Sequence, residues 1–322
     1  MRLNAFTTFQ PKTLKEALLL KQKYKEKALL KAGGTALIPE MRLRLKKPEC
    51  VILLNDIEEM KEIVKKTDGL HIGAAASLYD VGKSPLVAKG WAPLAGAVET
   101  VSAPSMHFQS TIGGNLCQDT RCIYYDQSEF WRGVKGACFK QGGDRCHAVP
   151  GSKTCRSVYQ GDLAPILVCM DASVCIAAPK QEKMVKIANL FSGNGLAPFK
   201  LPANAIIAGI VIPPVGKKKI AYEKFSERGA LDYPVAGVAA SVEFSRNRVK
   251  SHCFAATSIG SVPLVLSEPL LNGRRFDEDF IAAAAEAIFR KARPVANTAA
   301  APAFRKEMTK ALLERVLRRL TP

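Results

Sequence analysis

Residues 28–45 read ALLKAGGTALIPEMRLRL, which is an apolar run, a glycine pair and a second apolar segment. Residues 28–32 are predicted to form a short buried strand that Gly33-Gly34-Thr35 brings to an end. Two consecutive glycines let the backbone turn tightly and present successive N–H groups to one point, as in an anion-binding nest. An ordinary strand-to-helix turn has the same composition, so this motif alone leaves phosphate binding and a plain turn both open.

The segments around this turn have helical and extended patterns. Thr13 and Glu16 have the spacing of a capping box, which predicts that a helix begins there. The predicted elements are a helix at 13–27, strands at 50–54 and 206–212, a hairpin at 62–75 turning at Asp68-Gly69, helical turns from about 77 to 102, a meander of 219–226 with two alternating runs at 235–244 and 249–257, and helices at 277–292 and 302–320.

A second glycine pair occurs in Ser110-Thr111-Ile112-Gly113-Gly114-Asn115, again with hydroxyl and amide neighbours. Two such turns on either side of a compact α/β segment suggest a pyrophosphate held from two directions. Asp162, in GDLAP at 161–165, is able to accept hydrogen bonds from a ribose or ribityl hydroxyl. A helix N-cap is the other interpretation and, for this residue taken alone, the better one.

The stretch from Cys117 to Gly161 is rich in thiols. It contains five of the nine cysteines, namely Cys117, Cys122, Cys138, Cys146 and Cys155. An ordinary structural loop gains little from so many thiols, whereas iron–sulfur centres and structural zinc require soft thiolates. His147 beside Cys146 offers a zinc-like ligand. The residues therefore indicate a metal centre and leave iron–sulfur and zinc both open.

The composition limits the class of protein. The chain has 322 residues, 48% of them hydrophobic, and a formal net charge of +18. No apolar run reaches about eighteen residues and the start lacks a signal-peptide core, so we expect no membrane span and a cytoplasmic location. The charge surplus attracts polyanions or acidic proteins. Because no nucleic-acid module is visible, we expect an acidic protein partner and no nucleic acid.

Four motifs in a fixed order carry a resemblance to a known family: AGGTALIP at 32–39, STIGGNL at 110–116, GDLAP at 161–165 and KFSERGALDYPVAGVAAS at 224–241. Together they resemble the FAD-binding subunits of the molybdenum hydroxylases, the xanthine and carbon monoxide dehydrogenase group, over essentially the whole chain. The resemblance implies an α+β fold with a two-part, PCMH/VAO-like FAD-binding domain at 1–215 (sub-domains about 1–57 and 58–215). A smaller C-terminal α+β domain, an antiparallel sheet with helices, would follow at 216–322.

The resemblance also implies which residues bind FAD. Residues of the first pyrophosphate loop would be Ala32, Gly33, Gly34, Thr35 and Ala36, and those of the second Thr111, Gly113, Gly114 and Asn115. Asp162 would face the ribityl or ribose hydroxyls, and Lys224 would lie near the flavin. Ala36 is a departure, since many members have a polar residue there; its side-chain contact would be lost while the backbone nest survives.

Within this family the cysteine-bearing insertion at about 117–161 resembles that of the β subunits of 4-hydroxybenzoyl-CoA reductases, which carry a [4Fe–4S] cluster in addition to FAD. The run GGNLCQDTRC, followed by SEFWR and GDRCH, carries this similarity. By resemblance the cluster ligands are Cys122, Cys138, Cys146 and Cys155, with Cys117 a neighbour. No paired C-x₂₋₄-C knuckle of the usual zinc type occurs among these four.

The implied function is an electron relay without catalytic residues of its own. Electrons from ferredoxin would pass through the [4Fe–4S] cluster and FAD to [2Fe–2S] clusters and molybdopterin on partner subunits, in a dimer of heterotrimers, for reductive dehydroxylation of an aromatic CoA thioester. We expect ferredoxin to be guided by Arg132, Lys135, Lys140 and Arg145. The alternatives are a molybdenum hydroxylase that oxidises an aldehyde, a purine or carbon monoxide, and a zinc-stabilised basic nucleic-acid-binding protein.

Overall fold

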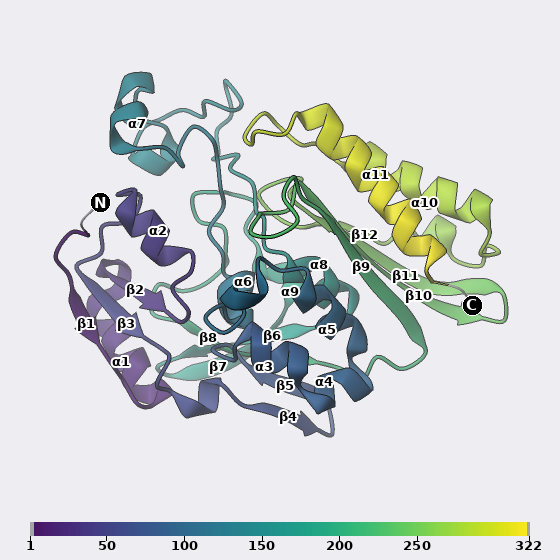
Figure 1. Cartoon of the computed structure of the whole chain (residues 1–322), viewed down its shortest axis with the longest axis horizontal. Helices are drawn as coiled ribbons and strands as arrows, with labels where there is room; N and C mark the ends of the chain where they lie inside the picture. Colours follow the sequence, from purple (N-terminus) through teal and green to yellow (C-terminus); the bar gives the residue numbers. More distant parts are fainter. Residues whose placement is uncertain (1–2, 321–322) are drawn as a thin grey trace.

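The computed structural model describes residues 3–320, and its strands form three separate β-sheets (Figure 1). The first sheet contains β1 (Thr7–Phe9), β2 (Ala28–Lys31) and β3 (Cys50–Leu53) in the order β1-β3-β2, with both pairs parallel. Helix α1 (Leu14–Tyr24) lies against β3, and Thr13 Oγ1 accepts a hydrogen bond from Glu16 N at 3.2 Å. The predicted N-cap, the strand ending before Gly33 and the strand at 50–54 are therefore confirmed.

The second sheet is antiparallel and lies in the middle of the molecule (Figure 1). Its order is β4-β5-β8-β6-β7, with β4 (Ile63–Lys66), β5 (Gly69–Gly73), β6 (Ser173–Ala178), β7 (Gln181–Lys186) and β8 (Ile206–Ile212). The predicted hairpin and the strand at 206–212 are confirmed. The helices that belong to this part are α3 (Leu78–Lys83), α4 (Pro85–Gly90), α5 (Ala92–Glu99), α6 (Ile112–Leu116), α8 (Leu163–Cys169) and α9 (Ile187–Leu190). Helix α2 (Leu37–Arg42) follows β2 and lies near the first sheet (Figure 1).

The third sheet is the predicted meander, in the order β12-β11-β10-β9. Its strands are β9 (Lys218–Phe225), β10 (Ala236–Ser245), β11 (Arg248–Thr257) and β12 (Leu264–Leu266), and its helices are α10 (Glu278–Lys291) and α11 (Pro302–Arg318). Both helices lie on the outer side of this sheet, whereas α8 of the preceding part contacts β10 and β11 (Figure 1).

Strand β10 is buried at every residue from Ala236 to Val242, although the sequence pattern alternates there. The side chain of Ala239 packs into the large core of the first two sheets, whereas Val238 and Ala240 pack into a second core with α10 and α11. The period of two is preserved, but a hydrophobic layer covers each face of the strand. The third sheet therefore lies between the core of the first two sheets on one face and helices α10 and α11 on the other.

The cysteine-bearing segment is mostly loop, and its main helix is α7 (Glu129–Lys135), which lies away from the three sheets and near α2 (Figure 1). Arg132 fixes this helix to the body, because its buried guanidinium donates to the carbonyl oxygens of Leu43 and Arg44 at 3.2 and 3.3 Å. Phe130 and Trp131 remain largely exposed. Among the described residues, no helix is both long and apolar enough to cross a bilayer.

Candidate functional site

The two glycine turns meet at a cavity of about 550 Å³, a size within the range of small-molecule and cofactor sites. The predicted flavin residues that line it are Ala32, Gly33, Gly34, Thr35, Ala36, Thr111, Gly114, Asn115 and Asp162. Gly113 and Lys224 belong to the predicted set but do not line the cavity. Segments that are far apart in the sequence therefore converge on one hollow, as the two glycine pairs had suggested.

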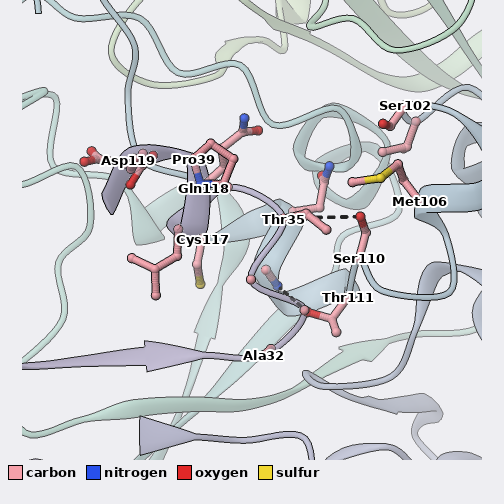
Figure 2. Close-up of a pocket in the computed structure, with 18 of the residues that line it drawn as sticks. Ala32, Thr35, Pro39, Ser102, Met106, Ser110, Thr111, Cys117, Gln118 and Asp119 are labelled. Atoms are coloured by element: carbon pink, nitrogen blue, oxygen red, sulfur yellow. Dashed lines mark hydrogen bonds between the residues drawn. The ribbon is translucent and has the colours of Figure 1, made fainter. Parts of the chain in front are cut away.

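The first glycine turn connects β2 to α2 and lies directly against the second. A Cβ atom on Gly33 would lie 1.8 Å from the carbonyl oxygen of Gln109, so no other residue fits without moving that backbone. Gly34 has a φ of 75°, which also favours glycine. Ser110 Oγ donates to Thr35 Oγ1 at 3.4 Å and joins the two turns across the cavity wall (Figure 2).

In the second turn, Thr111 is the N-cap of α6, and its Oγ1 accepts a hydrogen bond from Gly114 N at 3.0 Å (Figure 2). The N–H of Gly114 is therefore already engaged, and the backbone nest predicted there is only partly free. Gly113 has a packing role instead. A Cβ on it would lie 2.5 Å from the oxygen of Ala74, on the side of the turn that faces the protein.

Asp162 occupies the N-cap position of α8, as the cap interpretation predicted, but its side chain makes no capping hydrogen bond. The N–H of Leu163 donates instead to Asn115 Oδ1 at 3.0 Å. The Asp162 side chain is buried beside Lys224, whose Nζ lies 2.9 Å from Oδ1. This contact is an ion pair outside hydrogen-bond geometry, since Oδ1 has no hydrogen-bond donor among the described residues. Burial raises the pKa of the Asp162 carboxyl, and Lys224 opposes that rise.

Lys224 stands behind Asp162 and holds three parts of the protein together. Its Nζ donates to the carbonyl oxygens of Thr100 at 3.2 Å and Asp232 at 2.9 Å, in addition to its contact with Asp162. Thr100 follows α5 and Asp232 lies in the loop after β9. Lys224 therefore supports the cavity wall from outside.

The loop after β9 belongs to the motif at 224–241, of which only Lys224 is predicted to lie near the flavin. Its residues Arg228, Leu231, Asp232 and Tyr233 line the cavity. The guanidinium of Arg121, from the cysteine-bearing segment, lies 4.2 Å from the centre of the Tyr233 ring, and its Nη1 donates to the Tyr233 hydroxyl at 3.2 Å. Such a contact is stabilising. No chemical signal in a short arginine- and tyrosine-containing loop could have predicted this position.

One end of the cavity is strongly charged. Glu40, Lys46 and Asp119 line it there, and Figure 2 places Asp119 beside Pro39 and Gln118, away from Ser102 and Met106. Asp119 Oδ2 lies 2.6 Å from Lys46 Nζ, and its Oδ1 accepts from Lys140 Nζ at 3.0 Å. Burial, together with the Asp119 charge, raises the pKa of Glu40 to about 7. The sequence could not reveal this cluster because its members come from three separate segments.

The structure brings some of the predicted cluster ligands near one another. Burial raises the pKa of Cys122 to about 12, and Cys155 and Cys146 lie close enough to contribute to that rise. All four predicted ligands are free thiols, and Cys155 Sγ lies 3.2 Å from Ser157 Oγ. Within residues 3–320, however, no three His, Cys, Asp or Glu side chains are arranged so that they could hold a metal ion. The cysteines therefore supply the type of donor atom that a cluster needs, but their side chains are not arranged around one point.

Cys117 and the side chains of two of the four residues predicted to guide ferredoxin lie inside the protein and not on its surface. Cys117 lines the flavin cavity, and burial raises the pKa of its thiol to about 12. The side chains of Arg132 and Lys140 are buried by their bonds to backbone carbonyls and to Asp119, so they are not available for direct contact with a partner. Lys135 and Arg145 are exposed.

The cavity fits the FAD that the sequence implied. Its two walls approach so closely at Gly33 that a Cβ would fill the space between them, and Thr35 contributes a hydroxyl. Asp162 in the same wall has a buried carboxylate whose Oδ1 is paired with the Lys224 ammonium, and its remaining acceptor capacity suits a ribose or ribityl hydroxyl. When bound, FAD would supply the redox chemistry and the chain its position and electrostatic surroundings.

Family models match almost the whole chain. The FAD binding domain in molybdopterin dehydrogenase matches residues 4–215, and the CO dehydrogenase flavoprotein C-terminal domain matches residues 220–320. The chain therefore belongs to the family of FAD-binding subunits of molybdenum hydroxylases, and it is an oxidoreductase subunit. The predicted family is confirmed.

Individual relatives agree with this assignment. The chain is 30% identical to the aldehyde oxidoreductase FAD-binding subunit PaoB of Escherichia coli (strain K12), over 75% of this chain and 78% of that protein. It is 24% identical to the carbon monoxide dehydrogenase medium chain of Hydrogenophaga pseudoflava, over 97% and 96%.

Solved structures show the same fold. Carbon monoxide dehydrogenase from Hydrogenophaga pseudoflava matches with a TM-score of 0.80 at 24% identity, covering 99% of this chain and 98% of that one. Quinoline 2-oxidoreductase from Pseudomonas putida 86 matches with a TM-score of 0.78 at 20% identity, with the same coverage. The chain therefore has the mixed α/β fold of this family, which agrees with the helices and sheets of the predicted α+β fold.

Proposed function

We propose that this chain is the FAD and [4Fe–4S] subunit of a molybdenum enzyme of the 4-hydroxybenzoyl-CoA reductase type. The observation that carries the flavin part is the cavity between the two glycine turns, with Asp162 in its wall. FAD would lie with its pyrophosphate against the turns at Gly33-Gly34 and Gly113-Gly114, and with Asp162 facing its hydroxyl groups. Lys224 would act from behind, by fixing the Asp162 carboxylate.

The proposed cluster ligands are Cys122, Cys138, Cys146 and Cys155. Their free thiols are the donors that iron–sulfur clusters require, and Cys122 has Cys146 and Cys155 as neighbours. Because these thiols do not form a closed ligand set, the proposal requires the loops of the cysteine-bearing segment to close around the cluster. Most of that segment is irregular, which makes such an adjustment possible at little cost in secondary structure.

The proposed partners are a molybdopterin subunit and a [2Fe–2S] subunit in a dimer of heterotrimers, with ferredoxin as the electron donor in the cytoplasm. Electrons would run from ferredoxin to this subunit and on to molybdenum, for reductive removal of a phenolic hydroxyl from an aromatic CoA thioester. Helix α7 supports a docking role, because Phe130, Trp131 and Val134 are 73, 59 and 64% exposed beside the basic Lys135. Aromatic anchors are typical of protein interfaces.

The first experiment is cofactor analysis of anaerobically purified protein. We expect one FAD and about four irons with acid-labile sulfide per chain. Replacing Cys138 or Cys146 by Ser should abolish the iron and leave FAD bound, whereas Cys175→Ser, on β6, should change neither. Flavin without iron and sulfide would contradict the cluster, and stoichiometric zinc without flavin would favour the zinc-protein alternative.

A second experiment addresses the donor. Reversal of the exposed charges with Lys135→Glu and Arg145→Glu should slow electron transfer from ferredoxin and weaken its salt dependence, because steering charges act on association rate. Lys183→Glu, on the exposed strand β7, is the matched control. Transfer that is insensitive to both reversals and to salt would remove the docking proposal.

The alternative within the same family is oxidation of another substrate. The names of the relatives concern an aldehyde oxidoreductase, a nicotinate dehydrogenase and a carbon monoxide dehydrogenase. Turnover of the whole complex with aromatic CoA thioesters and reduced ferredoxin, compared with aldehyde or nicotinate oxidation, separates the two. Activity only in the oxidative assays would favour the alternative.

A further inference from the structure

Glu40 is a carboxylate in the cavity wall that no predicted binding role uses. It lies in α2, just beyond the first glycine turn, and is partly buried. No side-chain hydrogen bond contributes to its pKa, and no ion pair involving it occurs among residues 3–320. A carboxylate held in a cavity without a partner is costly when charged, since burial penalises the ionised form.

The neighbouring Asp119 differs in this respect. Lys46 Nζ lies 2.6 Å from one of its oxygens and Lys140 Nζ 3.0 Å from the other. Although burial acts in the opposite direction, Lys140 and Lys46 hold the pKa of Asp119 below its usual value. Asp119 therefore stays ionised, and both lysines are committed to it.

Glu40 lies close enough to Asp119, Lys46 and Lys140 for their charges to change its pKa. Burial is the largest cause of its raised pKa, Asp119 is the second, and Asp126 adds to it, whereas Lys46 and Lys140 oppose it. Tyr233, from the loop after β9, also faces it, since Glu40 contributes to the raised pKa of that hydroxyl. The result is a carboxyl whose protonated and ionised forms are both populated near neutral pH.

We propose that Glu40 accepts a proton when negative charge develops in the cavity during reduction of its occupant. The step is Glu40–COO⁻ + H⁺ → Glu40–COOH, with the proton from solvent; no bond to carbon changes, and the added electrons stay on the occupant. Uptake of the proton compensates the negative charge added to the occupant, which the ionised Asp119 nearby would otherwise repel. Glu40 lines the cavity and directly follows Pro39, which Figure 2 places beside Asp119 of the cysteine-bearing segment.

This inference rests on the proposed function, because it requires a redox-active occupant. The test is the pH dependence of the midpoint potential of bound flavin in the assembled complex. Because Glu40 is already about half protonated at pH 7, the potential of the wild-type protein should fall by about 15 mV more per pH unit there than that of Glu40→Gln, and by about 30 mV more above pH ~8, where one proton accompanies two electrons at Glu40. Glu58→Gln, at an exposed side chain that does not line the cavity, should behave as wild type.

A second variant tests whether the charge of Asp119 sets the pH range in which Glu40 takes up its proton. Asp119→Asn removes the nearest negative charge and releases two lysines toward Glu40, so the steeper region should move to lower pH. A reduction-induced infrared spectrum should also show a gain of protonated carboxyl in wild type that Glu40→Gln lacks. Equal slopes and equal infrared spectra in wild type and Glu40→Gln would overturn the inference while leaving flavin binding intact. Absence of flavin from the wild-type protein would instead overturn the proposed function.

Discussion

The ammonium nitrogen of Lys224 lies 2.9 Å from Asp162 Oδ1, and each side chain is only 6% exposed. The two residues belong to segments matched by different family models. Asp162 lines the cavity, whereas Lys224 lies in β9 and also donates to the carbonyl oxygens of Thr100 and Asp232. The pair therefore ties the wall of the flavin site to the sheet of the C-terminal part.

Lys224→Met should destabilise the protein by about 3–5 kcal/mol at pH ~8, because it leaves the buried Asp162 carboxylate without its counter-ion. The penalty should shrink as pH falls, since Asp162 then becomes neutral by binding a proton. Denaturant unfolding at several pH values measures both effects. Lys186→Met removes an exposed pair with Asp171 and should cost less than about 1 kcal/mol; equal losses in the two variants would contradict this account.

Gly33→Ala should abolish flavin binding, because the new methyl group would lie 1.8 Å from the Gln109 carbonyl oxygen and would force the two glycine turns apart. Flavin fluorescence titration of the apoprotein measures the loss directly. Gly96→Ala is the matched control. It lies within α5 with no heavy atom within 4 Å of the added Cβ, so it should leave binding unchanged and stabilise the helix by about 0.5–1 kcal/mol. Normal affinity in Gly33→Ala would show that the turns can separate freely.

Glycine pairs and apolar periodicity are local signals, and they were sufficient for most of the cavity and for many of the elements, whereas β1, β6, β7, β12 and α7 were not predicted. The residues around Asp162 could not show that its side chain leaves α8 uncapped, since the N–H of Leu163 donates to Asn115 Oδ1, which lies far away in the sequence. The sequence also could not separate buried from exposed cations. Nothing in the sequence distinguishes Arg132 and Lys140 from the exposed Lys135 and Arg145. In the structure, however, Arg132 donates to the Leu43 carbonyl and Lys140 pairs with Asp119.

Arg305 should be among the most sensitive residues of the C-terminal part. It is fully buried in α11, and its guanidinium donates to Val295 O at 2.9 Å, to Asn297 Oδ1 at 3.0 Å and to Ser258 O at 3.0 Å. Arg305→Met should cost about 3–5 kcal/mol in unfolding free energy because three acceptors, two of them buried and one partly buried, lose their donor. Arg290→Met, at a largely exposed pair, should cost less than about 1 kcal/mol. A loss in Arg305→Met no larger than that would contradict this role.

Glu40 should make the stability of the protein depend on pH. Its pKa is raised from 4.5 to about 7 in the folded state, so the folded protein binds a proton more tightly there than the unfolded chain does. The corresponding stability is fully present below pH ~4.5 and is lost as pH rises through ~7. Glu40→Gln, which carries no charge at any pH, should therefore match wild type near pH ~4.5 and exceed it by on the order of 2 kcal/mol at pH ~8, after allowance for partial solvent screening. Urea unfolding of both proteins across this range, with Glu58→Gln as control, measures the difference. A constant difference between Glu40→Gln and wild type at all pH values would show that Glu40 does not titrate in this window.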